Sequence, residues 1–468
     1  MVRNSIVVAA LATASTVYAQ ASCGLGNNCP KDSPCCSQYG QCGVGAYCLG
    51  GCDPRSSFTL DSCVPEPVCQ SKTYKFDSLD GITSKTEYLG DSSKTAWVMD
   101  GQAVTYNDNV LLTMAPSTVG TVLASSTYMW YGNVSATFKT SRDAGVVTAF
   151  ILLSDVHDEI DYEFVGTELT TAQTNYYFQG IPDYDNSGNI TLSDTFENFH
   201  TYEIQWTPDS ITWLVDGQVG RVKQRSETYN ATAKQWNFPQ TPARVQLSIW
   251  PGGLASNAPG TISWAGGPIS WDSPDIKNNG YYYATLQDVT VSCYNAKSAP
   301  GTNSGSSYTY NNAIGLNNTV VDGDKPTVLK SLLGTGTNMS ADYPHAASSS
   351  SSSKSSSASK PKASQSEIAT IPGLSGAGPG TDGHPDQGDD SSSSDTSSAP
   401  SSTATSGSSS GSSSSSSSGN SGFSQGGDSG DSSSSSSTNA AGKLGGQEKV
   451  LKGSIFAGVV AVVAMMAM

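Results

Sequence analysis

Three acidic residues alternate with apolar residues in the segment from Glu159 to Phe164. In a β-strand alternate side chains share one face, so we expect Glu159, Asp161 and Glu163 to point one way. Four residues of strand separate the Cα atoms of the two glutamates by roughly 13 Å. Side chains that lean toward each other can bring the carboxyl groups to roughly 5–6 Å, the spacing at which retaining glycosidases use one as nucleophile and the other as acid. The spacing therefore favours cleavage of a glycosidic bond.

The acidic pattern has two other interpretations, an exposed strand face that is merely acidic and a calcium site. Like charges on one face repel each other, however, and calcium loops usually draw Asp, Asn and Gly from a turn. Three close acids cannot all ionise cheaply, so at least one is expected to have a raised pKa, as a general acid needs. All eight tryptophans lie between Trp97 and Trp271, and this aromatic context favours carbohydrate chemistry.

Residues 70–297 must position these acids, and their pattern is that of strands. The alternation has period 2 and is broken by turn signals such as Asp216-Gly217. Two aromatic and β-branched runs, 200–206 and 211–215, flank a short turn and predict a hairpin. No comparably long stretch has helical periodicity. A segment of this length and pattern predicts an all-β fold, a single sandwich of the jelly-roll type.

Nine of the ten cysteines fall within residues 23–69. So small a module has almost no apolar core and must be held by disulfides, and an even number of cysteines indicates an oxidising compartment. The run from Cys35 to Cys42 (CCSQYGQC), followed by Tyr47-Cys48, resembles the hevein-type chitin-binding module. A purely structural disulfide knot is the alternative.

The hevein resemblance implies that Ser37, Tyr39 and Tyr47 contact N-acetylglucosamine, because flat rings can stack on a sugar and a hydroxyl can bond its acetamide. The family often has a second aromatic ring where this chain has Gln41, which predicts weak or restricted binding. The resemblance also implies three disulfides: Cys23 with Cys36, Cys29 with Cys42, and Cys35 with Cys48. The partners of four cysteines stay open: Cys52, Cys63, Cys69 and Cys293.

The segment from Glu159 to Glu163 (EIDYE) resembles the E-x-D-x-E signature of glycoside hydrolase family 16, whose fold is a β-jelly roll. The closer likeness is to the fungal Crh group of cell-wall transglycosylases, supported in order by segments 129–132, 174–177, 200–207, 240–242, 248–253 and 260–267. The resemblance implies that Glu159 is the nucleophile, Asp161 its assistant and Glu163 the acid/base. It also implies chitin as the donor and β-glucan as the acceptor.

Transfer to a sugar and transfer to water share the first half of this mechanism, so the acidic motif does not choose between them. An aromatic platform that holds a sugar acceptor would favour transfer. Trp250 and Trp264 are the predicted platform, and core packing is the alternative for both. A plain β-glycan hydrolase is therefore a second functional hypothesis. A non-catalytic wall-anchored chitin-binding protein is a third, and the intact acidic motif argues against it.

Both ends of the chain predict export and anchoring. Residues 1–19 are typical of a signal peptide, and residues 440–468 of a GPI-attachment propeptide with Asn439 as the anchored residue. Residues 298–439 are predicted to be a linker and a disordered serine-rich stalk, because this composition buries too little apolar surface to offset its ordering entropy. Residues 20–69 are then the hevein-like module with its connector. N-glycosylation is predicted at Asn133, Asn189, Asn230, Asn317 and Asn338.

The remaining composition excludes several classes of function. A net charge of −16 argues against a nucleic-acid partner. His157 and His200 are the only histidines in residues 70–297, so no histidine-based metal cluster is expected there. The sequence has no glycine-rich phosphate loop and no G-x-S-x-G elbow with a partnered histidine. We therefore predict no cofactor and no metal.

Overall fold

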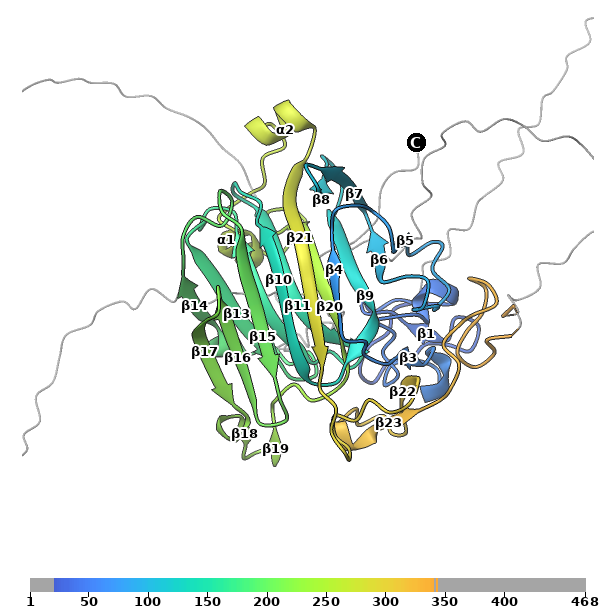
Figure 1. Cartoon of the computed structure of the whole chain (residues 1–468). Helices are drawn as coiled ribbons and strands as arrows, with labels where there is room; N and C mark the ends of the chain where they lie inside the picture. The colour runs from blue at the N-terminus through green and yellow to red at the C-terminus, as the bar shows by residue number, and fades with distance from the viewer. Residues whose placement is uncertain (1–20, 341, 344–468) are drawn as a thin grey trace, which may run out of the picture. The chain divides into compact units, whose positions relative to one another are not determined.

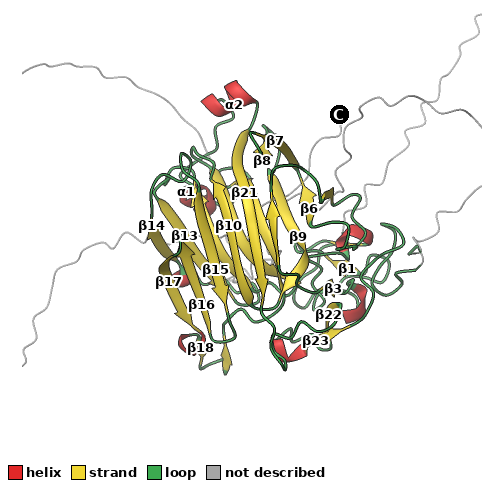
Figure 2. Ribbon diagram, in the orientation of Figure 1, coloured by secondary structure: helices red, strands yellow, loops and turns green. Residues whose placement is uncertain are grey.

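The computed structural model describes residues 21–340 and 342–343 of the 468. The predicted signal peptide, stalk and GPI-attachment site at Asn439 lie outside the described residues. Two eight-stranded sheets account for most of the described chain. Figure 2 shows how few helices accompany the strands.

One sheet carries the acidic motif, and we call it the acid-bearing sheet. Its neighbouring strands are antiparallel except for the parallel pair β5 and β6. In spatial order it contains β14 (Gly188–Thr191), β13 (Thr171–Tyr177), β12 (Glu159–Val165), β11 (Val146–Ser154), β20 (Ala243–Pro251), β9 (Thr121–Met129), β6 (Trp97–Asp100) and β5 (Ile82–Ser84).

The second sheet covers the inner face of the first (Figure 1). In spatial order it contains β17 (Gln218–Gln224), β16 (Ser210–Val215), β15 (His200–Trp206), β10 (Gly132–Lys139), β21 (Tyr282–Cys293), β8 (Asn109–Met114) and β7 (Gln102–Tyr106), with β4 (Lys72–Lys75) also paired to β21. The predicted hairpin is confirmed, because β15 and β16 pair in antiparallel register.

Aromatic side chains fill the space between the two sheets. The ring of Phe138 on β10 contacts Phe164 on β12 at a centroid distance of 5.5 Å, and Tyr202 on β15 at 4.5 Å. All three residues belong to one core cluster that draws on both sheets. This arrangement is a two-layer β-sandwich. The predicted all-β sandwich is confirmed.

Short elements complete the described chain. The helices α1 (Pro259–Trp264) and α2 (Pro274–Asn279) lie in the connection between β20 and β21. Two-residue strands form the pair β18 (Tyr229–Asn230) and β19 (Gln235–Trp236), and single 3₁₀ turns occur at Gly45–Tyr47, Leu60–Ser62, Tyr184–Asn186, Arg225–Glu227 and Asn317–Thr319. Within the described ranges no helix is long and apolar enough to cross a membrane.

Residues 23–69 form the disulfide module, which contains the two-stranded sheet of β1 (Cys35–Cys36) and β2 (Cys42–Gly43). All ten cysteines lie in the described chain and all are paired. The disulfides are Cys23–Cys36, Cys29–Cys42, Cys35–Cys48, Cys52–Cys63 and Cys69–Cys293. The first three are the pairs that the hevein resemblance implies. The fifth ties the start of the sandwich to the end of β21.

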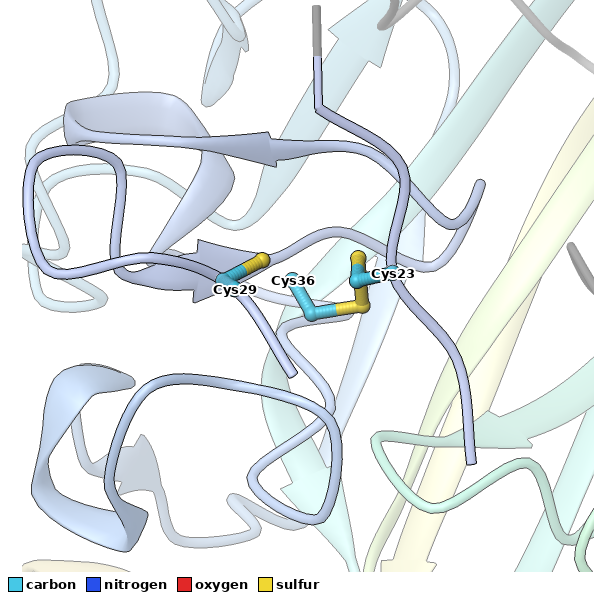
Figure 3. A group of neighbouring side chains, drawn as sticks. All are labelled: Cys23, Cys29 and Cys36. Atoms are coloured by element: carbon cyan, nitrogen blue, oxygen red, sulfur yellow. A yellow bond between two sulfur atoms is a disulfide. The ribbon is translucent and has the colours of Figure 1, made fainter. Parts of the chain in front are cut away.

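Figure 3 shows Cys23, Cys29 and Cys36 close together in the module. Their sulfur atoms lie within 4.8 Å of one another, a spacing that would suit a metal ion. Each of the three sulfurs is part of a disulfide, however, and a metal ligand must be a thiolate. The cluster is therefore two packed cystines.

The chain after residue 297 differs from the predicted linker. Residues 307–323 contain β22 (Ser307–Tyr310) and β23 (Val320–Gly323), and β22 pairs with β3 (Glu66–Pro67). Leu329, Leu332 and Met339 then pack against the disulfide module. Burial of these side chains explains why the segment up to residue 343 is folded rather than extended as a spacer.

Candidate active site

The acidic motif occupies β12, near the middle of its sheet. Ile160, Tyr162 and Phe164 point into the core between the sheets. The Tyr162 hydroxyl donates a hydrogen bond of 2.8 Å to the carbonyl of Leu214 on the second sheet. These contacts fix the strand, so its alternate residues must face away from the core.

Glu159, Asp161 and Glu163 therefore share the outer face of the acid-bearing sheet. They are 5%, 1% and 4% exposed, so they are not a solvated strand face. Burial of three neighbouring carboxyl groups is costly unless at least one keeps its proton. The burial is what a site that excludes water from charged intermediates requires.

The neighbouring strands supply the floor and one wall of this site. On β11, Ala149, Ile151 and Leu153 lie opposite the three acids and form a small apolar cluster. On the other side β13 places Tyr177 opposite Glu159, Asn175 opposite Asp161 and Gln173 opposite Glu163. The Asn175 amide donates to the Tyr177 hydroxyl at 2.7 Å. The acids thus have an apolar neighbour on one strand and a polar neighbour on the other.

The electrostatics of the site favour protonated carboxyl groups. Desolvation, reinforced by the charge of Glu159, raises the pKa of Glu163 well above its ordinary value. Desolvation and then the charge of Glu163 raise the pKa of Asp161, while a hydrogen bond with Glu159 and the charge of Arg221 oppose that rise. Burial and the charges of all three acids also raise the pKa of the Tyr177 phenol. The expected raised pKa is present at Glu163, as a general acid requires.

Asp158 anchors the start of β12, a role that the sequence pattern did not reveal. Its carboxylate accepts hydrogen bonds from the backbone of Gln179 at 3.0 Å and of Gln240 at 2.9 Å, and from the Thr241 hydroxyl at 2.7 Å. It is 1% exposed. Three connections that are distant in sequence are joined by this one carboxylate, which fixes the position of Glu159 next to it.

The predicted tryptophan platform lies on the same outer face. Trp250 on β20 and Trp264 in α1 are stacked with centroids 6.0 Å apart and an interplanar angle of 25°. The Trp264 indole donates a hydrogen bond of 2.8 Å to the side chain of Gln173, the residue opposite Glu163. Trp250 is buried and Trp264 is half-buried. The pair therefore lies at the Glu163 end of the acidic row, outside the core between the sheets.

The predicted sugar contacts of the module separate into two groups. Ser37 and Tyr39 line a cavity between the module and the acid-bearing sheet. Tyr47 is 6% exposed and belongs to the cluster that the module forms with Leu329 and Leu332. A Cβ atom at Gly43 would lie 2.3 Å from the Tyr47 ring, so the ring packs directly on the module backbone. Tyr47 thus lies in the packing of the module.

The two histidines of the sandwich lie outside the acidic row. His157 ends the turn between β11 and β12 with a φ of 62°, and its Nε2 is 3.7 Å from Asp53 of the module. His200 forms hydrogen bonds with Ser193 at 3.0 Å and with Asp216 at 2.7 Å. His157 and His200 therefore make separate contacts on different sheets, each with a carboxylate.

The five predicted glycosylation sites are all accessible to some degree. Asn133, Asn189 and Asn338 are exposed, whereas Asn230 and Asn317 are half-buried. Asn230 also accepts hydrogen bonds from the backbone of Thr232 and Ala233. A glycan on Asn133, Asn189 or Asn338 would not need to enter the core.

A β-sandwich with a buried row of acids on one face, and aromatic side chains beside that row, has the features of a carbohydrate-active enzyme. The family model described as Glycosyl hydrolases family 16 matches residues 91–266. Crh-like protein 3 of Botryotinia fuckeliana is 70% identical over 341 residues, which cover 73% of this chain and 76% of that protein. Crh-like protein 2 of Aspergillus fumigatus is 53% identical over 353 residues, covering 74% and 80%. The chain belongs to the Crh-like proteins of glycosyl hydrolase family 16.

A similarity to solved structures was also found. The structure described as Crh5 transglycosylase in complex with NAG is 28% identical, with a TM-score of 0.47, and covers 58% of this chain and 99% of that chain. Family membership makes this protein an enzyme of the glycoside hydrolase and transglycosylase type, and the predicted membership is confirmed.

Proposed function

We propose that this protein is a cell-wall transglycosylase that cleaves chitin and transfers the released chain to β-glucan, cross-linking the wall. The observation that carries the proposal is the buried row of Glu159, Asp161 and Glu163 on one face of β12. The row occurs in a chain of the Crh-like group. Two carboxyl groups on one side of a bound sugar are sufficient for a retaining mechanism.

The first half of the reaction forms a glycosyl-enzyme. A carboxylate oxygen of Glu159 bonds to the anomeric carbon of the donor while the bond from that carbon to the leaving oxygen breaks. Glu163 gives its proton to the leaving oxygen. Burial and the neighbouring Glu159 charge raise the pKa of Glu163, so the proton is available near neutral pH.

The second half regenerates the enzyme. An acceptor hydroxyl oxygen attacks the anomeric carbon, Glu163 takes the hydroxyl proton, and the ester bond to Glu159 breaks. Asp161 lies between the two glutamates on the outer face of β12. Its proposed role is to orient the nucleophile. The mechanism uses carboxyl groups alone and requires no metal or cofactor.

The acceptor decides between transfer and hydrolysis, and the tryptophan pair supports transfer. Trp250 and Trp264 lie at the Glu163 end of the row, and Gln173 joins Trp264 to that end. An aromatic platform beside the acid/base can hold a sugar acceptor in place of water. We therefore assign the pair to the acceptor side of the site.

The proposal also covers location. Five disulfides suit an oxidising, extracytoplasmic compartment. Residues 1–19 would direct secretion. Cleavage after Asn439 would join that residue to a GPI anchor, which would hold the protein on the outer face of the plasma membrane. The glycosylated stalk would let the enzyme reach the wall. The disulfide module would bind chitin, and no nucleic acid takes part.

Labelled acceptors test this function. The secreted enzyme is incubated with chitin oligosaccharide donors and a fluorescent β-glucan oligosaccharide. Label in products longer than the acceptor is the expected result. New reducing ends without longer labelled products would instead identify a hydrolase, and no cleavage of chitin donors would contradict the proposed donor.

A further inference from the structure

A cavity lies between the disulfide module and the acid-bearing sheet. The module contributes Ser37, Gln38 and Tyr39 to its wall. The sheet contributes Arg244 and Gln246 from β20, together with side chains of β6 and β9. Neither the module nor the sheet forms it alone.

Two side-chain donors in this cavity have no acceptor. Gln246 is 4% exposed and Arg244 is 7% exposed, yet neither the Gln246 amide nitrogen nor the Arg244 Nε finds a hydrogen-bond partner among the described residues. Buried donors are almost always paired, in proteins or with a ligand or water. The two donors therefore indicate an oxygen-bearing molecule in the cavity.

The Arg244 guanidinium is held in place by the module. Its Nη2 donates to the side-chain oxygen of Gln38 at 2.8 Å. A Cβ atom at Gly50 would lie 2.4 Å from Nη1, and one at Gly51 would lie 2.8 Å from Nη2. Glycine at both positions lets the module backbone reach the guanidinium. This close fit fixes the position of the guanidinium against the module.

The cavity opens on the same face as the acids. Gln246 lies opposite Ile151, and Ile151 lies opposite Asp161, so the three side chains share one row across the sheet. Two strand spacings separate Gln246 from Asp161, roughly 10 Å. A polymer bound at the acids can therefore reach the cavity by crossing β11. Trp250 and Trp264 mark the Glu163 end of the row, and Val122 of the cavity wall packs in the same apolar cluster as this pair.

The walls favour a neutral molecule with apolar faces. Tyr39, Tyr88, Val98 and Val122 supply rings and methyl groups. The charged side chains at the cavity are compensated: Lys85 forms an ion pair with Asp100, and Arg244 lies near the carboxyl groups of Glu66 and Asp155. An anionic or cationic ligand would add an uncompensated charge, whereas a sugar adds none. An acetamide suits this wall, since its oxygen can accept from the two donors while its methyl group contacts the apolar side chains.

We propose that this cavity is a subsite for an N-acetylated sugar residue of the donor chain, built jointly by the disulfide module and β20. The proposal rests on the proposed function, because it concerns the same glycan. In this arrangement the module is part of the donor cleft. It holds the chain on the far side of Ile151, so that the bond to be cleaved lies over the acids.

Donor length is the variable that tests this subsite. Gln246→Leu removes one donor with little change in volume, and KM is measured for chito-oligosaccharides from short to long. Loss of one hydrogen bond should raise KM for long donors about 5-fold to 10-fold, and clearly less for donors too short to reach the cavity. Gln205→Leu, on β15 of the other sheet, is the matched control and should leave KM unchanged for both long and short donors.

A second variant and a binding measurement keep the test decisive. Tyr39→Ala, on the module, should show the same dependence on length if Gln246→Leu fails to fold. Calorimetry on Glu159→Gln should show tighter binding of long N-acetylated chains than of β-glucan chains of equal length, and Gln246→Leu in that background should remove the difference. The subsite is overturned if the two glycans bind equally well. It is also overturned if the change in KM is independent of donor length in both variants. An enzyme that uses no chitin donor at all contradicts the proposed function instead, and calorimetry still reports on the cavity.

Discussion

The β-sandwich buries aromatic side chains between two sheets, whereas the disulfide module buries mainly its own cystines. Phe138, Phe164 and Tyr202 pack in the sandwich without any covalent link. In the module four disulfides lie within residues 23–63. The sandwich therefore depends on apolar burial, and the module depends on restricting its unfolded chain.

The two regions also differ in what they contribute to the site. The sandwich carries the acids on a strand that the core fixes on its other face. The module contributes a wall, with Gly51 donating its backbone N–H to Asp155 at 2.8 Å and Gln38 accepting from Arg244. Chemistry can thus be lost without loss of the module, and the module can be loosened without loss of the acids. Four variants test this separation.

Glu159→Gln should have the largest effect, a loss of transfer of about 10³-fold or more, because the amide cannot form the glycosyl ester. Binding of chitin by the module should persist, since Glu159 does not line its cavity. Initial rates with labelled acceptors and a chitin pull-down measure the two quantities. Glu203→Gln, on β15, is the matched control and should leave both unchanged. Retention of transfer in Glu159→Gln would exclude Glu159 as the nucleophile.

Phe138→Ala tests the sandwich. It removes a fully buried ring that contacts both sheets, so the free energy of unfolding should fall by about 3–5 kcal/mol. Denaturant titration followed by circular dichroism measures the change. Phe199→Ala is the control, because the Phe199 ring is 37% exposed and its loss should cost less than about 0.5–1 kcal/mol. Similar costs for the two variants would mean that this core is not what stabilises the sandwich.

Cys52→Ser with Cys63→Ser tests the module. Removal of this disulfide should destabilise the module by about 2–4 kcal/mol, through the larger entropy of its unfolded chain. Hydrogen exchange read by mass spectrometry should accelerate in residues 23–69 and stay slow in β10, β11 and β12. If the sandwich strands exchange faster to the same degree, the two regions unfold as one unit, and their separation is wrong.

The features with a short sequence period could be predicted. Alternation with period 2 places Glu159, Asp161 and Glu163 on one face whatever the rest of the chain does, and the aromatic runs on either side of a turn give the β15–β16 hairpin. The first three disulfides follow from a resemblance that spans a short segment. Each of these features is decided by residues close to one another in the chain.

The features that depend on distant pairing could not be predicted. The segment after residue 297 folds because β22 pairs with β3, which lies more than two hundred residues earlier in the chain. The alternating Tyr308 and Tyr310 are the local indication of this strand in the sequence. The role of Asp158 has no signal in the sequence, because its hydrogen-bond partners come from two separate connections that are distant in the chain. Tyr177 could have been found as the end of an alternating run, but only the β12–β13 register places it opposite Glu159.

Glu66 offers the smallest and most specific test of how module and sandwich meet. This β3 carboxyl is 4% exposed, and desolvation followed by the charge of Asp155 raises its pKa well above the ordinary value, while Arg244 opposes the rise. Desolvation likewise raises the pKa of Asp155 to about 6. The native state therefore keeps protons that the unfolded chain releases, so the free energy of unfolding is highest below the ordinary carboxyl pKa and falls as pH rises through about 4 to 6 and beyond.

Glu66→Gln mimics the protonated carboxyl at every pH and should remove part of this fall. We expect the variant to gain stability over the wild type as pH rises, by an amount on the order of 1 kcal/mol at pH 8, with no gain at pH 4. Thermal unfolding across this range measures it, and exposed Glu87→Gln is the control. A variant that is less stable than the wild type at pH 8 would mean that Glu66 is ionised and paired in the native state. The junction between module and sandwich would then be held by charge, since Arg244 is the cation that faces Glu66.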